Sequence, residues 1–423
     1  MATARLSDYV RIVGEEPIEE LRRLAAPLQG MRIQHINSTR VGGGVAEILD
    51  RLVPLSRELG LDAVWDVIEG DQRFFQVTKA FHNALQGKAA DLVPEDFEAY
   101  LATNRRNAER VALDGDMVFV HDPQPAALVT YARRPRPGAR LVWRCHIDIS
   151  RPQERVWRFL ERFVSRFHAA ILSAPQFGRP LGIPQYLVPP SIDPLADKNR
   201  ELSPEEVMAV LDRFGIDRRR PIVTQISRFD RFKDPVGVIR AFRMVRRRVN
   251  CQLVLAGGGA TDDPEGAEVL AEVQEAAGSH PDVRILALET RSDVEVNALQ
   301  RASQVVVQNS TKEGFGLTVS EALWKERPVV AGATGGIPLQ VIDGFDGYLI
   351  HSPEGAAHAI RYLLQNPAEA ERMGHNGRSH VQRNFLLTRQ LRNELLVIHS
   401  MLAPDQPEVV LEAALEGGAH VDA

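Results

Sequence analysis

The sequence of 423 residues has few cysteines and no long apolar run. Its two cysteines, Cys145 and Cys251, lie far apart inside expected strands, which favours buried thiols in a reducing compartment over a disulfide or metal site. No apolar run approaches the ~20 residues that span a bilayer. The amino-terminal segment is interrupted by charges and has no apolar signal-peptide core. We therefore expect a cytoplasmic protein.

Lysine is also scarce, since it supplies only six of the 51 basic residues. Each lysine is worth attention, because an ammonium and a guanidinium are not interchangeable at a phosphate. The net charge is −5 and the basic residues are scattered along the chain. This distribution argues against nucleic acid or an anionic membrane as the main partner.

Strand-like and helix-like segments alternate throughout the chain, which predicts parallel sheets with helices on both faces. The expected strands are 31–37, 63–68, 117–121, 140–146 and 169–173 in the first half, and 222–226, 251–256, 283–286, 304–307 and 329–331 in the second. Two such series predict an α/β protein with two doubly wound, Rossmann-like domains.

The domain boundary is expected in the proline-rich segment 188–194, because its prolines exclude helix and stiffen the link. This segment separates an amino-terminal domain, 1–190, from a carboxyl-terminal domain, 191–386. A last helix, at about 387–403, is expected to pack back on the amino-terminal domain. The acidic end, 404–423, is expected to be flexible.

The most informative motif runs from Glu313 to Glu321 and follows the expected strand 304–307. A glycine-containing turn leads into a helix that should begin at or near Leu317. Helix N-termini offer N–H groups and partial positive charge to a phosphate. In a sugar-nucleotide site, one carboxylate could face the sugar and the other the ribose. Ordinary capping charges would give the same pattern, so this segment alone leaves both interpretations open.

Two other motifs follow expected strands. Gly42, Gly43 and Gly44 precede a helix and allow a ligand to approach the backbone closely, although a turn without a ligand would look similar. The dinucleotide fingerprint is not clearly met and the P-loop pattern is absent, which argues against an NAD enzyme or an NTPase. Arg228 and Lys233 follow the first strand of the second domain. They suit a diphosphate clamp, but an exposed basic loop is the alternative.

Two histidines, His121 and His146, lie at strand ends in the first domain. Ligands of open α/β sheets bind beyond the carboxyl ends of the strands, so one of these imidazoles is a candidate for the site. A lone histidine is more often structural than catalytic. No zinc-ligand spacing occurs, and the G-x-S-x-G motif of α/β-hydrolases is absent.

Together these motifs resemble the retaining glycosyltransferases of GT-B fold. Within that group, H-I-N-S-T at 35–39, G-G-G-V-A-E-I-L at 42–49 and V-T-K-A-F-H-N-A-L-Q-G at 77–87 are similar to the trehalose-forming branch. That branch contains the glycosyltransferring trehalose synthases and the retaining trehalose phosphorylases. The resemblance covers roughly residues 30–400 and implies two domains that face each other across a cleft.

The resemblance implies transfer of glucose from ADP-, UDP- or GDP-glucose to free glucose, which forms α,α-trehalose reversibly by a front-face mechanism. The implied donor-site residues are Gly43 and Gly44 at the phosphates, Arg228 and Lys233 at the diphosphate, Glu313 at the glucose hydroxyls, Gly314, Phe315, Gly316, Leu317 and Thr318 along the sugar and distal phosphate, and Glu321 at the ribose. The implied catalytic set is His146, Arg228, Lys233 and Glu313. The acceptor site would comprise Asp122 with Gln124, Lys79 or His82.

The expected partners are small molecules: NDP-glucose, glucose and trehalose. A homodimer is left open, and no resident cofactor or metal is expected. Mg²⁺ could stimulate the reaction, but no protein ligand set indicates it. The main alternative is a trehalose phosphorylase that uses phosphate or glucose 1-phosphate. More distant alternatives are a transferase to another acceptor and a non-catalytic sugar-nucleotide-binding regulator, because fold does not determine function.

Overall fold

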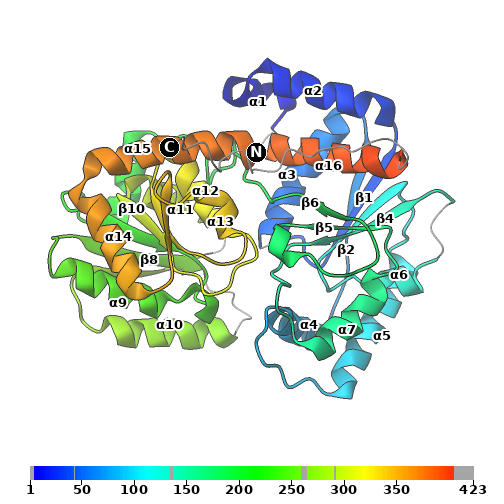
Figure 1. Ribbon diagram of the computed structural model, residues 1–423, viewed down its shortest axis with the longest axis horizontal. Helices are drawn as coiled ribbons and strands as arrows, with labels where there is room; N and C mark the ends of the chain where they lie inside the picture. Colours follow the sequence, from blue (N-terminus) through cyan, green and yellow to red (C-terminus); the bar gives the residue numbers. More distant parts are fainter. Residues whose placement is uncertain (1–3, 42, 134–136, 259–263, 290–291, 404–423) are drawn as a thin grey trace, which may run out of the picture. The chain divides into compact units, whose positions relative to one another are not determined.

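The computed structural model describes residues 4–41, 43–133, 137–258, 264–289 and 292–403 (Figure 1). Gly42 and the expected flexible end, 404–423, lie outside these residues. The chain divides into two compact units. The first contains Met1–Ser191 and Leu387–Ala423, and the second contains Ile192–Leu386. No helix within the described ranges is both long and apolar enough to span a bilayer.

The first unit is built on a six-stranded parallel sheet with the strand order β2-β1-β3-β4-β5-β6. The strands are β1 (Arg32–Asn37), β2 (Asp62–Val67), β3 (Met117–His121), β4 (Arg140–Cys145), β5 (Ala169–Leu172) and β6 (Gln185–Leu187). The inner strands are almost entirely buried, whereas the edge strands β2 and β6 are partly exposed. Burial on both faces explains the apolar runs of β3, β4 and β5, whereas the inner strand β1 also buries polar side chains.

Helices flank this sheet along its length. They are α1 (Leu6–Val13), α2 (Glu15–Ala25), η1 (Ala26–Leu28), α3 (Gly44–Glu58), α4 (Gln72–Leu85), α5 (Pro94–Arg110), α6 (Leu128–Tyr131), α7 (Glu154–Val164), η2 (Pro175–Phe177) and α16 (Leu387–Leu402). Although α16 is last in the sequence, it packs beside α2 and α3 (Figure 1). Arg392 forms an ion pair with Glu20 at 2.8 Å, and His399 Nε2 donates to the Leu24 carbonyl at 2.7 Å.

The second unit has a parallel sheet with the strand order β12-β11-β10-β7-β8-β9. Its strands are β7 (Ile222–Ile226), β8 (Gln252–Gly258), β9 (Val283–Leu288), β10 (Val305–Gln308), β11 (Val329–Gly332) and β12 (Gly347–Ile350). Its helices are α8 (Pro204–Arg213), η3 (Arg231–Lys233), α9 (Pro235–Arg246), α10 (Pro264–Ala277), α11 (Asp293–Ala302), α12 (Leu317–Trp324), α13 (Ile337–Gln340), α14 (Pro353–Gln365) and α15 (Pro367–Asn384).

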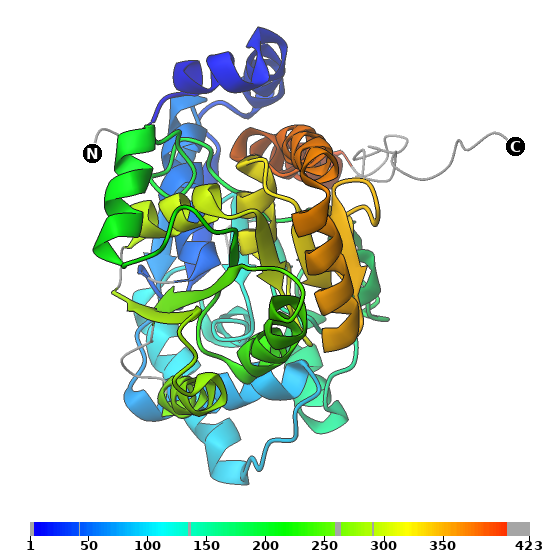
Figure 2. The same ribbon diagram turned by 90° about the vertical axis from the view of Figure 1, so that its left-hand side faces the viewer.

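Separate apolar clusters cover the two faces of this second sheet. Helices α9, α10 and α14 pack on one face, and α8 and α11 pack on the other (Figure 2). This layering fixes the strand ends, so that the loops after β7 and β10 emerge from neighbouring strands at the carboxyl edge of the sheet. Such an edge is where α/β sheets bind ligands.

Candidate active site

In the second unit, the loops after β7 and β10 bring Lys233 and Glu313 together. Lys233 Nζ donates a hydrogen bond to Glu313 Oε2. The two side chains are only 17% and 11% exposed. Ser310 Oγ donates to the same carboxylate oxygen at 3.1 Å. A carboxylate taken out of water needs such partners, so this cluster is a preorganised ionic site rather than a pair of solvated charges.

Asp234 holds the lysine-bearing loop against the neighbouring strand end. Its Oδ1 accepts from the Gly237 N–H at 2.9 Å, which caps α9. Its Oδ2 accepts from Asn309 Nδ2 at 2.7 Å. The backbone of Asp234 is left-handed, with φ 43°, which costs a non-glycine residue about 1 kcal/mol. The two side-chain hydrogen bonds offset this strain and thereby position Lys233.

The turn that follows Glu313 requires glycine. Gly316 is the N-cap of α12 and has φ 85°. A Cβ on Gly335 would lie 1.7 Å from the Glu313 carbonyl oxygen, and Gly335 also has a positive φ of 54°. The helix begins at Leu317, as expected from the sequence. The N–H groups of a first helical turn have no partner within the helix, which makes the turn 314–318 suitable for an anion.

Three other predicted donor residues of this unit, Arg228, Phe315 and Glu321, have contacts outside the Lys233–Glu313 pair. Arg228 is 57% exposed and its Nη2 lies 3.8 Å from Asp230 Oδ2. Glu321 is buried on α12. Phe315 is also buried, and its ring packs edge-on against Phe385 with the centroids 5.5 Å apart. The structure therefore pairs Lys233 with Glu313 and Arg228 with Asp230.

In the first unit, Asp122 and His146 are joined at the carboxyl ends of β3 and β4. Asp122 Oδ1 accepts from the His146 backbone N–H at 2.7 Å. Asp122 has φ 65°, and its carbonyl accepts from Trp143 Nε1 at 3.0 Å. Burial raises the pKa of Asp122 to about 6, although the hydrogen bond from His146 and the charge of Arg144 oppose this change. Asp122 therefore positions His146 as well as offering a carboxylate.

The sequence indicated His121 and His146 separately, but it did not show that their rings contact each other. His121 Nδ1 lies 3.0 Å from His146 Nε2, and His121 Nε2 lies 3.1 Å from Nδ1 of His35. The sequence did carry a signal for this arrangement, because all three histidines lie at or near the ends of expected strands. Only the strand order shows that these strands are neighbours.

The remaining predicted residues of the first unit lie on separate elements. Gly43 is the N-cap of α3, which begins at Gly44. Gln124 follows Asp122 in the same loop, and its Oε1 is buried without a hydrogen-bond partner among the described residues. Lys79 and His82 lie on α4, where His82 Nε2 is 2.6 Å from Gln86 Nε2. Their acceptor roles remain predictions.

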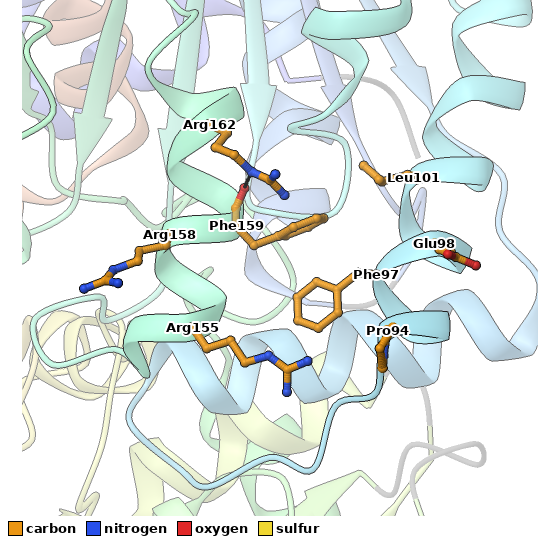
Figure 3. A pocket seen from close by; sticks show the side chains of 8 residues that line it. All are labelled: Pro94, Phe97, Glu98, Leu101, Arg155, Arg158, Phe159 and Arg162. Atoms are coloured by element: carbon orange, nitrogen blue, oxygen red, sulfur yellow. Dashed lines mark hydrogen bonds between the residues drawn. The ribbon is translucent and has the colours of Figure 1, made fainter.

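A surface pocket of about 530 Å³ between α5 and α7 contains none of the predicted site residues. Figure 3 shows Phe97 and Phe159 at its centre. The guanidinium of Arg155 stacks over Phe97 at 5.0 Å, and that of Arg162 stacks over Phe159 at 4.9 Å. Arg158 pairs with Glu154 at 2.7 Å. These contacts account for the arginines as packing partners within the unit.

Comparison with known proteins identifies the family. The family model of the trehalose synthase N-terminal domain matches residues 35–179, and the family model of glycosyl transferases group 1 matches residues 210–380. A trehalose synthase from Pyrococcus horikoshii is 43% identical, over 94% of this chain and 96% of that protein. The chain belongs to the trehalose synthase family. A second family member, from Rubrobacter xylanophilus, is 45% identical, over 94% of this chain and 97% of its own.

More distant similarities support the same architecture. A trehalose phosphorylase from Pleurotus pulmonarius is 29% identical, over 89% of this chain and 58% of that protein. The structure resembles a UDP-forming α,α-trehalose-phosphate synthase from Burkholderia xenovorans, with TM-score 0.69 and 15% identity, over 88% of this chain and 99% of that one. At that identity the likeness shows the fold alone. The protein is a glycosyltransferase of trehalose metabolism with a two-domain GT-B fold.

Proposed function

We propose that this family member transfers glucose from a nucleoside-diphosphate glucose to free glucose, forming α,α-trehalose reversibly and with retention. The single observation that carries the proposal is the buried Lys233–Glu313 pair beside the N-terminus of α12. This cluster combines a sugar-binding carboxylate, a cation and backbone N–H groups, which are the groups that a sugar diphosphate requires.

Lys233 can serve both the carboxylate and a diphosphate. An ammonium carries three N–H donors, and the hydrogen bond to Glu313 uses one of them. The other two can point at phosphate oxygens while Glu313 accepts from glucose hydroxyls. We assign Arg228 to the outer part of the diphosphate, because its guanidinium is exposed and lies 3.8 Å from Asp230 Oδ2. The ribose hydroxyls are assigned to Glu321.

The proposed chemistry is a front-face substitution. The bond between the anomeric carbon and the diphosphate oxygen breaks, and the leaving group takes the electron pair. The acceptor hydroxyl forms the new bond on the same face and gives its proton to the departing phosphate. A double displacement would instead need a carboxylate nucleophile close to the anomeric carbon, and the sequence identifies none. Catalysis then rests on positioning and charge neutralisation.

In the first unit, we assign His146 to the donor glucose near the reacting carbon. Asp122 is assigned to the acceptor glucose, with Gln124, Lys79 or His82 as further acceptor contacts. The buried Oε1 of Gln124 supports this, because a buried acceptor without a protein partner can be satisfied by a ligand hydroxyl. No resident cofactor enters the proposal, so the reaction should proceed in the presence of EDTA.

One substrate screen tests the function. The protein is incubated with glucose and either ADP-, GDP- or UDP-glucose, or with glucose and glucose 1-phosphate. Formation of trehalose and NDP supports the proposal, and NMR of the product establishes its anomeric configuration. Trehalose and phosphate formed only from glucose 1-phosphate would contradict it. That second outcome would establish the phosphorylase alternative, which relatives named trehalose phosphorylases support at 28–30% identity.

The pH dependence of kcat/KM should report the ionisation of the Asp122 carboxyl group. Burial raises its pKa from the ordinary 3.8 to about 6, whereas burial lowers the pKa of His146 well below 6.5. We therefore expect kcat/KM to rise through about pH 6 as the carboxylate ionises, and Asp122→Asn to abolish this rise. Persistence of the same limb in Asp122→Asn would assign it to another group.

The contribution of Asp122 to folding stability should fall with rising pH, whereas kcat/KM should rise. The folded protein binds the proton more tightly than the unfolded chain, because the folded pKa of about 6 exceeds 3.8. This contribution to stability is complete below the unfolded pKa and is lost as pH rises through the folded one. The free energy of unfolding of Asp122→Asn relative to the native protein should therefore increase between about pH 4 and pH 6.

A further inference from the structure

Three adjacent strands place three histidines in a diagonal row across the first sheet. In the strand order, β1, β3 and β4 are neighbours. His35 pairs in register with Phe119, so His121 lies two residues further along β3 on the same face. His121 pairs with Arg144, and His146 again lies two residues further along. From one strand to the next, the histidine therefore lies two residues closer to the carboxyl edge of the sheet.

The imidazoles in this row are hydrogen-bonded to each other. His35 Nδ1 lies 3.1 Å from His121 Nε2, and His121 Nδ1 lies 3.0 Å from His146 Nε2. The rings of His121 and His146 are nearly parallel, at 11°, with centroids 5.3 Å apart. Phe119 supports the inner end, because its ring stacks on His35 at 5.1 Å. His35 and His121 are both buried.

The surroundings keep all three rings uncharged near neutral pH. Burial lowers the pKa of His35 to about 3 and places the pKa values of His121 and His146 well below 6.5. The buried Arg144 lowers the last two further. Two carboxylates are close by: Asp122, which accepts from the His146 N–H, and Glu394 of α16, whose charge acts on Arg144.

A neutral imidazole has one N–H donor and one acceptor nitrogen, so a row of hydrogen-bonded rings has only two consistent arrangements. If His35 donates to His121, then His121 donates to His146, and His146 carries its proton on Nδ1. If the direction reverses, Nδ1 of His146 is an acceptor. In both cases the tautomers of the three rings are set together, and Nδ1 is the ring nitrogen of His146 that the row leaves for a ligand.

We propose that His35 and His121 are positioning residues that orient His146 and couple its tautomer to their own. The row supports His146 as a buried carboxylate supports the histidine of a hydrolase triad, by holding the ring in one orientation. This inference rests on the proposed function only for the role of His146 at the donor glucose. The linkage of the three rings is independent of it.

Paired substitutions at His121 test the link to His146. Asparagine places a polar atom near the position of Nδ1, and glutamine places one near the position of Nε2. His121→Asn therefore retains the hydrogen bond to His146 but loses the one to His35, whereas His121→Gln does the reverse. We expect His121→Gln to lower kcat about tenfold or more, because a small displacement of a group at the reacting centre slows the reaction strongly. His121→Asn should lower kcat less. The KM of both variants should stay within about twofold of the native value.

The inner end of the row is tested with His35→Phe, which keeps the ring stacked on Phe119 but has no ring nitrogens. Its kcat should match that of His121→Asn, since both lose the same hydrogen bond. If the row acts as one unit, adding His35→Phe to His121→Gln should lower kcat no further. His168→Asn is the control: this histidine of the same unit accepts from the Leu141 N–H outside the row, and its substitution should leave kcat unchanged.

A spectroscopic measurement separates this inference from the proposed function. In protein labelled with ¹⁵N-histidine, the ring-nitrogen shifts report the tautomer of His146, with His146→Gln providing the assignment. Without any substrate, these shifts should change in His121→Gln and stay close to native in His121→Asn. That result supports the row even if no trehalose is formed. Identical His146 shifts in both variants, or equal kcat in both variants of an active enzyme, would overturn it.

Discussion

Replacing Lys233 with alanine should lower kcat about a hundredfold or more, because the proposed leaving group then departs without its nearest cation. Lys233 is held at the carboxyl end of β7 by the Asp234 contacts, and its ammonium is already oriented by Glu313. A fixed cation stabilises developing charge without reorganisation. Steady-state kinetics of trehalose formation will measure this effect, and near-native turnover would remove Lys233 from the proposed clamp.

The Lys233→Ala variant also leaves Glu313 buried without its cation. Breaking a buried pair in this way costs about 3–5 kcal/mol, so kinetics must be read alongside unfolding measurements. The double variant Lys233→Ala/Glu313→Gln removes the orphaned charge and should recover stability but not kcat. The matched control is Lys198→Ala in the same unit: this lysine is 19% exposed and lies 3.7 Å from Asp293. Its loss should leave kcat unchanged.

Arg228→Ala provides a second comparison for the clamp. This side chain is 57% exposed and contacts Asp230 only at 3.8 Å, so an isolated surface pair of this kind contributes about 1 kcal/mol or less to stability. We expect a loss of kcat of about a hundredfold, as for Lys233, but an unchanged free energy of unfolding. A variant with native kcat would show that the exposed arginine is not part of the clamp.

Most inner strands were predicted correctly because burial on both faces favours apolar residues in them. The expected strands at 117–121 and 222–226 coincide with β3 and β7. The edge strands β6 and β12 were missed. Each has only three or four residues, and β6 is partly exposed along its whole length. Partial exposure relaxes the hydrophobic pattern on which the prediction depends.

Short helices were missed for a related reason. α6 and α13 have four residues each, which is little more than one turn and too short to show a 3.6-residue period. The longer α8 was also missed, although its Ser203 forms a capping box with Glu206, a signal that the sequence does contain. In contrast, the start of α12 at Leu317 was expected from the glycine turn before it.

For the site, the sequence supplied the residue types but not their partners. Lys233 and Glu313 are 80 positions apart, and only the adjacency of β7 and β10 brings them together. The left-handed backbone of Asp122 and its link to His146 likewise depend on the register between β3 and β4. Partner identity is a property of the sheet topology, which local periodicity does not encode.

Lys325→Met should clearly destabilise the second unit. This lysine is buried, and its Nζ donates to Asn199 Oδ1 at 3.0 Å, Gln300 Oε1 at 2.8 Å and the Glu321 carbonyl at 3.0 Å. Methionine keeps the length of the side chain but leaves three acceptors without a donor. Since unsatisfied buried groups cost about 1–3 kcal/mol each, and burying the charge also carries a penalty, we expect a net loss of about 2–4 kcal/mol.

The pH dependence of this loss tests the electrostatic part of the argument. Burial lowers the pKa of Lys325 from 10.5 to about 7, although the charge of Glu321 opposes the change. Between these pH values the unfolded chain holds a proton that the folded protein releases. The contribution of Lys325 to the free energy of unfolding therefore rises with pH. The difference in free energy of unfolding between the native protein and Lys325→Met should therefore increase from about pH 7 to pH 10. A difference that stays constant over this range would show that the buried ammonium keeps its ordinary pKa.

Urea unfolding of the second unit can be followed separately from that of the first, because Trp324 is the one tryptophan between residues 192 and 386. Labelling with 5-fluorotryptophan resolves its ¹⁹F signal, which avoids treating a two-unit protein as a single transition. Arg219→Met is the control for losing a surface cation of the same unit: Arg219 is 91% exposed beside Asp217, and its substitution should lower the free energy of unfolding by about 1 kcal/mol or less. Equal losses in the two variants would show that the three hydrogen bonds of Lys325 add nothing to stability.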